Sequence, residues 1–536
     1  MDDSRFDGIL VGAGHNGLIT AAYLARAGLR IGVFERRSVA GGGFATVELS
    51  APGFKFNTHA LYSKLDDSPI PTDLDLARYG VSSIVPNPKK AFVRHDDYFV
   101  YYQNVEQTYN AIRRFSAKDA ETFKKVARQW YQWYVDFILP DMYSAPRPLD
   151  QWVSEIGKVP GGREYIDVAL NYTPMQYALE LFESEWCRLA VLRASGFTEY
   201  EPNSKGIPPL VFSTIVNWFI GKTVLIRGGT KRFVEALEQI ITGHGGKIFT
   251  DQPVERSSVE NGAARGIALA DGREVRADRF VVSALDPVHT FLFMVGDENL
   301  TDEVRERLSE YRFSGTSLFR VHLALSEKPV YGVSKKDPAV NEAWMYTIGF
   351  ETQEGVLKMS EQARAGLIPD CEGIGAGLIH DPSQAPPGGH VMYLGIAAPF
   401  ELAEGGAARW VDAVHETGDR LVEKFQEYAP NITSDKILGR FDYSPKDIEE
   451  YLPNMVNGDI NHGKLQNPDQ LGDNRPWPGM SRYRTFIDKL YLCGACTHPG
   501  GLATGAPGYN AANAIAEDLG IDKWWRPYEP RRIVTA

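Results

Sequence analysis

The stretch Asp7-Gly-Ile-Leu-Val-Gly12-Ala-Gly14-His-Asn-Gly17 decides the fold of this chain. Its apolar first half predicts a strand, and its second half has the spacing G-x-G-x-x-G that joins a strand to a helix. Residues 18–27 then have the apolar spacing of a helix, and a second apolar run, 31–34, ends at Glu35. A strand, a helix and another strand in this order predict a parallel βαβ unit and therefore an α/β fold.

This unit also predicts a binding site for the ADP half of a dinucleotide. Its glycines allow a tight turn and a close approach of the backbone to a diphosphate, and the helix offers free N–H groups and the positive end of its dipole. Glu35 stands where a carboxylate accepts hydrogen bonds from ribose hydroxyls. A glycine cluster at 41–43 lets the chain pass the cofactor again. The cofactor residues expected here are Gly12, Gly14, Asn16, Gly17, Glu35, Arg36, Gly42 and Gly43.

A second glycine-rich element stands late in the sequence. The apolar run 490–492 leads into a glycine-rich loop at 493–501, and Pro507 marks a helix start, where its missing N–H costs little. Flavin enzymes use such an element to hold the ribityl chain and to stabilise negative charge on the reduced ring, which a nicotinamide enzyme does not need. The dinucleotide is therefore predicted to be FAD. Its flavin part is expected near Gly494, Ala495, Gly505 and Ala506.

With these motifs the chain resembles the phytoene desaturase and carotenoid isomerase branch of the FAD-dependent oxidoreductases, and most of all its loosely characterised bacterial and mitochondrial members. The resemblance implies an α/β, glutathione-reductase-type FAD-binding fold, Rossmann-like, with an interleaved α+β substrate domain. At Ala495 the chain departs from many flavoproteins, which carry Asp there, so that contact must come from backbone or another side chain. The matching motifs span the chain: 11–17, 35–37, 41–42, 227–229, 283–287, 497–501 and 505–510.

The resemblance also implies two domains whose segments alternate along the chain. Val254 stands where this fold's backbone meets the adenine. In the same segment, Asp271-Gly272 between two apolar runs predicts a β-hairpin. The expected FAD-binding domain consists of residues 1–75, 225–300 and 481–525, and the expected substrate-binding domain of residues 76–224 and 301–480.

Composition places the chain among soluble globular proteins. It has 536 residues, 43% hydrophobic and 24% charged, which predicts two or three domains. A formal net charge of −12 disfavours nucleic acid and strongly anionic membrane surfaces as partners. Four cysteines in so long a chain indicate a reducing compartment, so a cytoplasmic location is expected. The oligomeric state stays open, a homo-oligomer included.

The sequence contains no run of about 18 apolar residues, so no transmembrane helix is predicted. The segment that comes nearest is 210–226, which Asn217, Gly221 and Lys222 interrupt. It is interpreted as a buried element near the cofactor. The alternatives are the wall of an apolar substrate tunnel and a patch that dips into a membrane, so peripheral membrane contact stays open.

The chemistry follows from the presence of a single dinucleotide fingerprint. Residues 373–377, Gly-Ile-Gly-Ala-Gly, fail the required spacing, and the Cys493-x-x-Cys496 pair in the late loop is interpreted as structural. The substrate itself is therefore expected to reduce the flavin, by hydride transfer from a C–H bond to N5 and loss of a proton from the neighbouring atom. The electrons would then pass to oxygen, a quinone or another carrier.

Catalytic side chains are harder to assign from sequence. His59 and His498 are candidates for a base or a hydrogen-bond donor because each lies in a segment expected near the flavin. Tyr172 in the expected substrate domain is a candidate for polarising a carbonyl, although packing is the favoured role for it and for Tyr177. No spacing typical of metal ligands is present.

The favoured function is an FAD-dependent dehydrogenase or desaturase. It would remove 2H from a C–C bond of a small apolar or cyclic-ketone-type substrate. Three alternatives stay open: an FAD-dependent amine oxidase, a redox-neutral flavin-dependent isomerase, and an FAD-binding protein without turnover that serves as an interaction partner.

Overall fold

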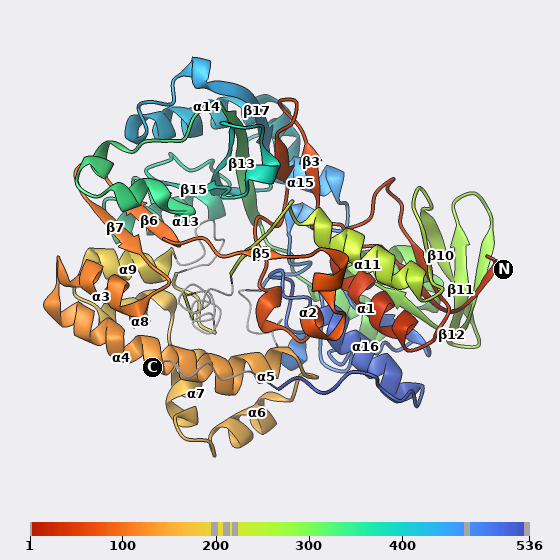
Figure 1. The fold of residues 1–536 in the computed structure, drawn as a ribbon. Coiled ribbons are helices and arrows are strands. Elements are labelled where there is room, and N and C mark those ends of the chain that lie inside the picture. The colour runs from red at the N-terminus through yellow and green to blue at the C-terminus, as the bar shows by residue number, and fades with distance from the viewer. Residues whose placement is uncertain (1–2, 194–201, 207–214, 217–222, 466–471, 530–536) are drawn as a thin grey trace.

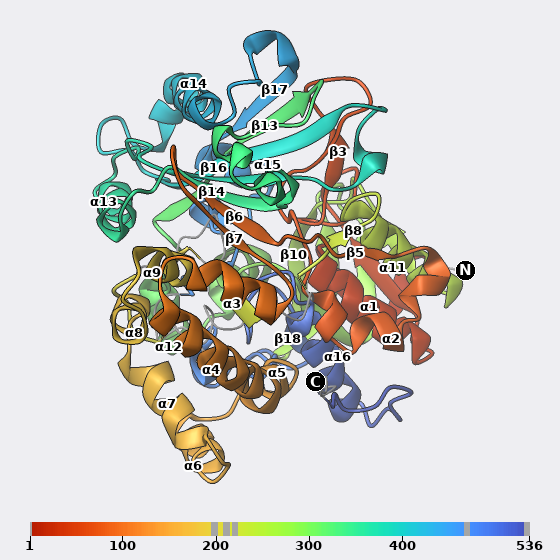
Figure 2. The same cartoon turned by 60° about the vertical axis from the view of Figure 1, so that its left-hand side comes forward.

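Two seven-stranded sheets organise the described part of the chain. Figure 1 and Figure 2 show the first sheet with helices α1, α11 and α16 on one side of the molecule, and the second sheet above a group of helices on the other. Most of the apolar segment 210–226 lies outside the residues that the structure describes. The computed structural model describes residues 3–193, 202–206, 215–216, 223–465 and 472–529.

The first sheet contains the predicted βαβ unit. β1 runs parallel to both β2 and β12, and β18 joins β12 on its far side, also in parallel. The apolar runs that predicted β1 and β2 are buried in the core, as parallel strands covered on both faces require. The strand order is β10 (Val254–Glu260), β11 (Ala263–Leu269), β12 (Glu274–Ser283), β1 (Arg5–Val11), β2 (Ile31–Phe34) and β9 (Lys247–Phe249), with β18 (Leu490–Leu492) beside β12.

Helices from distant parts of the sequence cover this sheet. α1 (His15–Arg26) packs between α11 (Lys231–Gly243) and α16 (Ala506–Asp518). β11 and β12 pair antiparallel around Gly272, whose φ of 87° suits the predicted Asp-Gly turn, so the hairpin is confirmed.

The second sheet is antiparallel except where β14 pairs with β6. α14 (Trp410–Tyr428) packs against β13, β16 and β17, and α13 (Gln353–Arg364) against β16. The strand order is β17 (Ile437–Tyr443), β13 (Thr316–Leu325), β16 (His390–Pro399), β15 (Ile374–Leu378), β14 (Met345–Ile348), β6 (Lys90–Val93) and β7 (Tyr98–Tyr101).

A layer of helices lies beside the second sheet, and several of these helices have an N-cap residue whose side chain accepts a hydrogen bond from the first turn. Asn104 caps α3 and Ser116 caps α4. The aromatic face of α4 is buried in the core, with Trp130 and Trp133 each about 2% exposed or less, so it serves packing. The helices are α3 (Val105–Arg113), α4 (Ala117–Trp133), α5 (Leu139–Met142), α6 (Leu149–Ile156), α7 (Gly162–Asn171), α8 (Pro174–Leu181) and α9 (Glu185–Leu192).

Along the chain, strands of the first sheet alternate with strands of the second. The residue bounds given above for the two domains stay a prediction. Within the described residues, no helix is both long and apolar enough to cross a membrane. The remaining elements are β3 (Thr46–Glu48) paired with β4 (Lys55–Asn57), β5 (Ser83–Ile84) paired with β8 (Leu225–Ile226), α2 (Ile70–Asp73), α12 (Asp302–Glu310) and α15 (Pro445–Tyr451).

Candidate active site

A cavity of about 470 Å³, called here the central cavity, lies at the carboxyl ends of the parallel strands. Val11 ends β1, Phe34 ends β2, and Ala284 and Gly494 follow β12 and β18; all four line the cavity. Open α/β sheets bind ligands at this edge, and the volume is within the ordinary range for ligand pockets. Of the predicted cofactor residues, those that line it are Gly12, Gly14, Asn16, Gly17, Glu35, Arg36, Gly42, Gly43, Val254, Gly494 and Ala495.

The G-x-G-x-x-G turn has no room for side chains on its inner face. A Cβ on Gly17 would lie 2.6 Å from the Gly12 carbonyl oxygen, and Gly12 itself has a φ of 92°. The second glycine cluster lies against the first, because the Gly41 amide donates to the Ala13 carbonyl at 2.8 Å. The two glycine clusters therefore form one backbone-lined wall, as the sequence predicts.

Three observations show that this wall suits a dinucleotide. A Cβ on Gly14 would meet no other atom within 4 Å, so the space outside the turn is open. α1 begins without a side-chain cap, which leaves its first N–H groups for a ligand. Asn16 carries a buried side-chain oxygen for which the described residues provide no hydrogen-bond partner. A diphosphate and its attached sugars would fill that space and meet those groups.

Glu35 is held in place beside the turn. Its two carboxylate oxygens accept hydrogen bonds from the Ala13 amide at 2.9 Å and the Arg37 amide at 3.0 Å, and the residue is 8% exposed. A carboxylate has about four acceptor positions, so the group retains capacity for ribose hydroxyls.

The late glycine-rich element contributes through its loop and not through its helix start. Gly494, Ala495, Gly501, Leu502 and Ala503 line the central cavity. Gly505 and Ala506 are not among the lining residues. A Cβ on Gly505 would lie 2.6 to 2.9 Å from side chains of Ile70, Ile19 and Leu65, and Ala506 is 0% exposed. The Cβ positions of both residues are thus packed within the core, and their contact with FAD stays a prediction.

His59 lines the cavity with both ring nitrogens occupied. Nε2 lies 3.1 Å from the Tyr443 hydroxyl, and Nδ1 lies 3.0 Å from the Thr58 hydroxyl. Burial, followed by the charges of Arg320 and Arg37, holds the pKa of His59 well below its usual value. The imidazole is therefore neutral near pH 7 and suited to hydrogen bonding, whereas accepting a proton there would be costly.

The other two catalytic candidates lie elsewhere. His498 is 4% exposed and places Nε2 2.8 Å from the Asp141 carbonyl oxygen, and it is not among the lining residues of the cavity. Tyr172 donates its hydroxyl to Glu180 at 2.7 Å, also away from the cavity. The structure therefore does not bring His498 or Tyr172 to the cavity beside His59. Tertiary packing, which the local sequence does not report, decides which side chains line the cavity.

Sequence reasoning missed two cations on the cavity wall. Lys64 is 6% exposed, its amide donates to the Ala503 carbonyl at 3.2 Å, and burial lowers the pKa of its amine to about 8. Arg320 donates to the carbonyl oxygens of Thr58 at 3.2 Å and His59 at 2.6 Å. A charged residue within the apolar strand β13 was the available signal for Arg320. Lys64 had none beyond its nearness to His59 in sequence.

The two late cysteines are buried free thiols. Burial raises the pKa of Cys493 to about 12 and raises that of Cys496 as well, so neither is a thiolate at neutral pH. Neither lines the cavity, in agreement with the structural interpretation of the pair.

Apolar and charged residues are unevenly distributed over the cavity wall. The acids among the described lining residues are Glu35 and Glu255, which belong to the part near Val254. Around His59 and Lys64, the charged lining residues besides Lys64 are Arg320 and Arg37. Asp67, which is not among the lining residues, lies close enough to Lys64 to oppose the lowering of its pKa. The apolar side chains that line the cavity there and beyond include Leu61, Leu318, Ile448, Leu452, Met455 and Ile460.

Comparisons with known proteins point to one family. The family model described as flavin containing amine oxidoreductase matches residues 17–395. A limonene dehydrogenase polypeptide of Castellaniella defragrans is 33% identical, over 99% of this chain and 97% of its own. A lycopene-forming phytoene desaturase of Paracoccus sp. is 23% identical, over 94% of this chain and 96% of its own. A solved oxidoreductase from Methanosarcina mazei has a TM-score of 0.58 at 19% identity, covering 96% of this chain and 100% of that one.

The family match covers more than half of the chain, and the fold and the open glycine wall agree with it. The resemblance to phytoene desaturases is confirmed, as are the Rossmann-like FAD-binding fold and FAD as the cofactor. The chain belongs to the flavin containing amine oxidoreductase family and is an FAD-dependent oxidoreductase enzyme.

Proposed function

We propose that this enzyme removes 2H from a C–C bond of a small apolar molecule, as a dehydrogenase or desaturase. The observation that carries the proposal is the charge distribution of the central cavity. Its region around His59 combines apolar side chains with the cations Lys64, Arg320 and Arg37, and the acids among the described lining residues are Glu35 and Glu255. A protonated amine would meet these cations, because Asp67, the carboxylate that acts on Lys64, is not among the lining residues. An uncharged hydrocarbon meets no such repulsion.

Two relatives support this choice of substrate class. The first is the limonene dehydrogenase polypeptide, whose name gives a small hydrocarbon as its substrate. The second is a phytoene desaturase, which aligns with 94% of this chain. The two names share the oxidation of an apolar compound, and the desaturase name specifies a C–C bond as the one oxidised. We extend this C–C dehydrogenation to the present chain. A cyclic ketone with an adjacent C–H bond stays within the class.

Bound FAD would supply the acceptor for a hydride from the substrate's C–H bond. The remaining roles fall to the chain. Lys64, with a pKa of about 8, is the lining group best matched to receive the proton lost from the neighbouring carbon. His59, held neutral between Tyr443 and Thr58, fixes the two hydroxyls that it contacts. Arg320 fixes the backbone of Thr58 and His59 from β13.

We further propose oxygen or a quinone as the electron acceptor. The glycine-rich segment 373–377 lies along β15, which pairs antiparallel with β14 and β16, so it opens no βαβ unit for a pyridine nucleotide. We also keep three predictions from the sequence as proposals: that the enzyme is cytoplasmic, that its two domains alternate along the chain, and that it can form a homo-oligomer. Peripheral membrane contact would supply an apolar substrate directly.

Product analysis tests the proposed reaction. The FAD-loaded enzyme is incubated with limonene and a soluble quinone, and the extract is analysed by gas chromatography and mass spectrometry. We expect a product two hydrogens lighter than the substrate. Oxidation of cyclohexylamine but not of limonene would support the amine oxidase alternative. A product of unchanged mass, formed after chemical reduction of the enzyme, would support the isomerase.

A further inference from the structure

A histidine and a buried carboxylate form a pair at the cavity wall that the catalytic account does not use. His289 Nδ1 donates to Asp286 Oδ2 at 2.6 Å, with side-chain exposures of 28% and 0%. The other oxygen of Asp286 accepts from the amides of Val288 at 2.9 Å and His289 at 3.1 Å. The carboxylate is therefore fixed by backbone, and it fixes the imidazole in turn. Since Nδ1 is engaged, Nε2 is the ring nitrogen that a ligand in the cavity can reach.

This pair stands next to the G-x-G-x-x-G turn. The Ala284 amide donates to the Val11 carbonyl at 2.9 Å, and the Ala284 methyl lies 3.4 Å from where a Cβ on Gly12 would be. His289 itself lines the central cavity together with Arg36. Ala284, two residues before Asp286, thus packs directly on the backbone that the diphosphate of FAD is expected to approach.

We propose that His289, oriented by Asp286, binds the diphosphate of FAD together with Arg36. The G-x-G-x-x-G turn consists of uncharged residues and offers the diphosphate the backbone N–H groups at the start of α1. The imidazolium of His289 and the guanidinium of Arg36 would add two positively charged hydrogen-bond donors. The proposal concerns the cofactor and holds whichever substrate the enzyme oxidises. It differs from the expected Glu35 contact, which involves the ribose.

The charges around His289 determine its protonation state. The hydrogen bond to Asp286 raises the pKa of His289 above its usual value, against the opposing effect of burial. Arg36 lowers the pKa, Glu449 raises it, and His462 also lies close enough for the two imidazoles to disfavour each other's charged forms. His289 is thus protonated at and below its ordinary pKa and loses its charge at higher pH. FAD should accordingly bind less tightly as the pH rises through that raised pKa.

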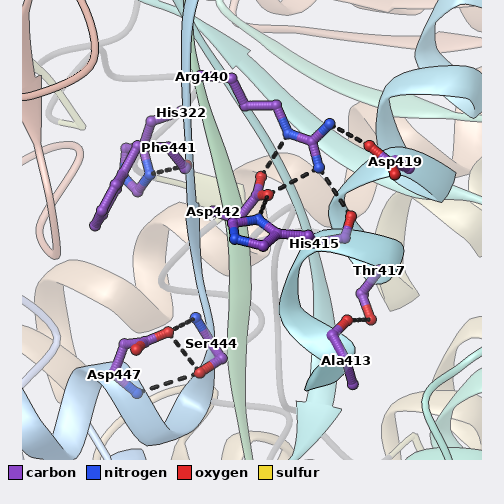
Figure 3. Close-up of polar contacts among 10 residues, drawn as sticks. All are labelled: His322, Ala413, His415, Thr417, Asp419, Arg440, Phe441, Asp442, Ser444 and Asp447. Carbon is purple, nitrogen blue, oxygen red and sulfur yellow. Dashed lines mark hydrogen bonds and ion pairs between the residues drawn. The ribbon is translucent and has the colours of Figure 1, made fainter. Parts of the chain in front are cut away.

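The chain offers a matched control on its surface. His415 Nδ1 donates to Asp442 Oδ2 at 2.9 Å, with side-chain exposures of 82% and 2%. Figure 3 shows this second pair at α14 and β17, where Arg440 also binds Asp442. It has the same histidine–carboxylate hydrogen bond as the pair at the cavity, with Arg440 on the carboxylate where Asp286 has backbone amides, and it is not part of the cavity lining. A change at His415 therefore tests the general effect of losing such a pair.

Phosphorus NMR of the FAD-loaded enzyme tests the proposal. The two phosphorus resonances are followed from about pH 6 to pH 9, a range that brackets a raised histidine pKa. We expect them to shift in the wild type with a midpoint above the usual histidine value. His289→Gln should abolish the shift and weaken FAD binding about tenfold, and His415→Gln should change neither. Asp286→Asn should move the midpoint to lower pH.

The same data can overturn the proposal. Resonances of the wild type that do not shift over this range would contradict it, as would a shift that survives His289→Gln. If His289→Gln cannot be isolated with FAD, the Asp286→Asn midpoint decides, because an unchanged midpoint would show that the titrating group is not His289.

Discussion

The hydroxyl of Thr20 donates a hydrogen bond to the carbonyl of Gly508 at 2.9 Å, although the two residues lie at opposite ends of the sequence. This contact joins α1, whose first residues line the central cavity, to α16. It is possible because Gly508 has no side chain: a Cβ there would collide with the carbonyl oxygen of Asn16. The cofactor wall therefore depends on a close helix contact that neither end can form alone.

Gly508→Ala should destabilise the protein, because the new methyl would force α16 away from α1. We expect a loss of about 1 to 3 kcal/mol, the usual cost of overpacking, measured by thermal or urea denaturation. Gly243→Ala is the matched control, since a Cβ at that helical position meets no atom within 4 Å. Equal losses in the two variants would show that the close contact is not what matters.

Gly14→Val should fold without FAD. A side chain at Gly14 points into open space, and φ is −65° there, so the protein itself tolerates valine. The same side chain would occupy the space of the diphosphate. The measurement is the ratio of flavin to protein absorbance, together with circular dichroism to check folding. A folded variant that keeps its full yellow colour would refute this placement of the cofactor.

Glu35→Ala should weaken FAD retention by about 1 to 3 kcal/mol, the cost of a lost hydrogen bond to a charged group. Equilibrium dialysis with FAD gives the affinity. Glu255→Gln serves as control, because Glu255 also lines the cavity but stands outside the βαβ fingerprint. If Glu255→Gln lowers the affinity as much as Glu35→Ala, the ribose contact has been assigned to the wrong acid.

Lys64→Met should remove the proton acceptor while leaving FAD bound. In the wild type, the rate of anaerobic flavin reduction should rise with pH through about 8, because only the neutral amine accepts a proton. The variant should be about 100-fold slower or more, without that pH dependence. Stopped-flow absorbance at several pH values supplies both quantities. An unchanged pH profile in Lys64→Met would assign the proton to another group.

The sequence predicted those features of the fold that local patterns encode. The βαβ unit, the Asp-Gly hairpin and the late strand beside β12 all appear in the structure. Each has its own spacing of apolar residues and glycines, and the parallel arrangement follows from connection rules. The cavity residues predicted from the first glycine turn line the cavity for the same reason.

The side chains that line the cavity from other segments were less accessible to sequence reasoning. Lys64, Arg320 and His289 reach one cavity from separate segments, and no local pattern reports that proximity. His498 lies within the flavin loop in sequence, but its ring turns to the backbone of Asp141. Gly505 has a positive φ of 70° and a crowded Cβ position, which are reasons for a glycine there besides the predicted cofactor contact. Tertiary packing decides such cases.

Direct passage of electrons from an apolar substrate to FAD is the central claim. Anaerobic mixing of the FAD-loaded enzyme with limonene, cyclohexylamine or NADH, each alone, tests it most directly. We predict that limonene bleaches the flavin band near about 450 nm and that the other two leave it unchanged. Bleaching by cyclohexylamine or NADH, with none by limonene, would contradict the claim.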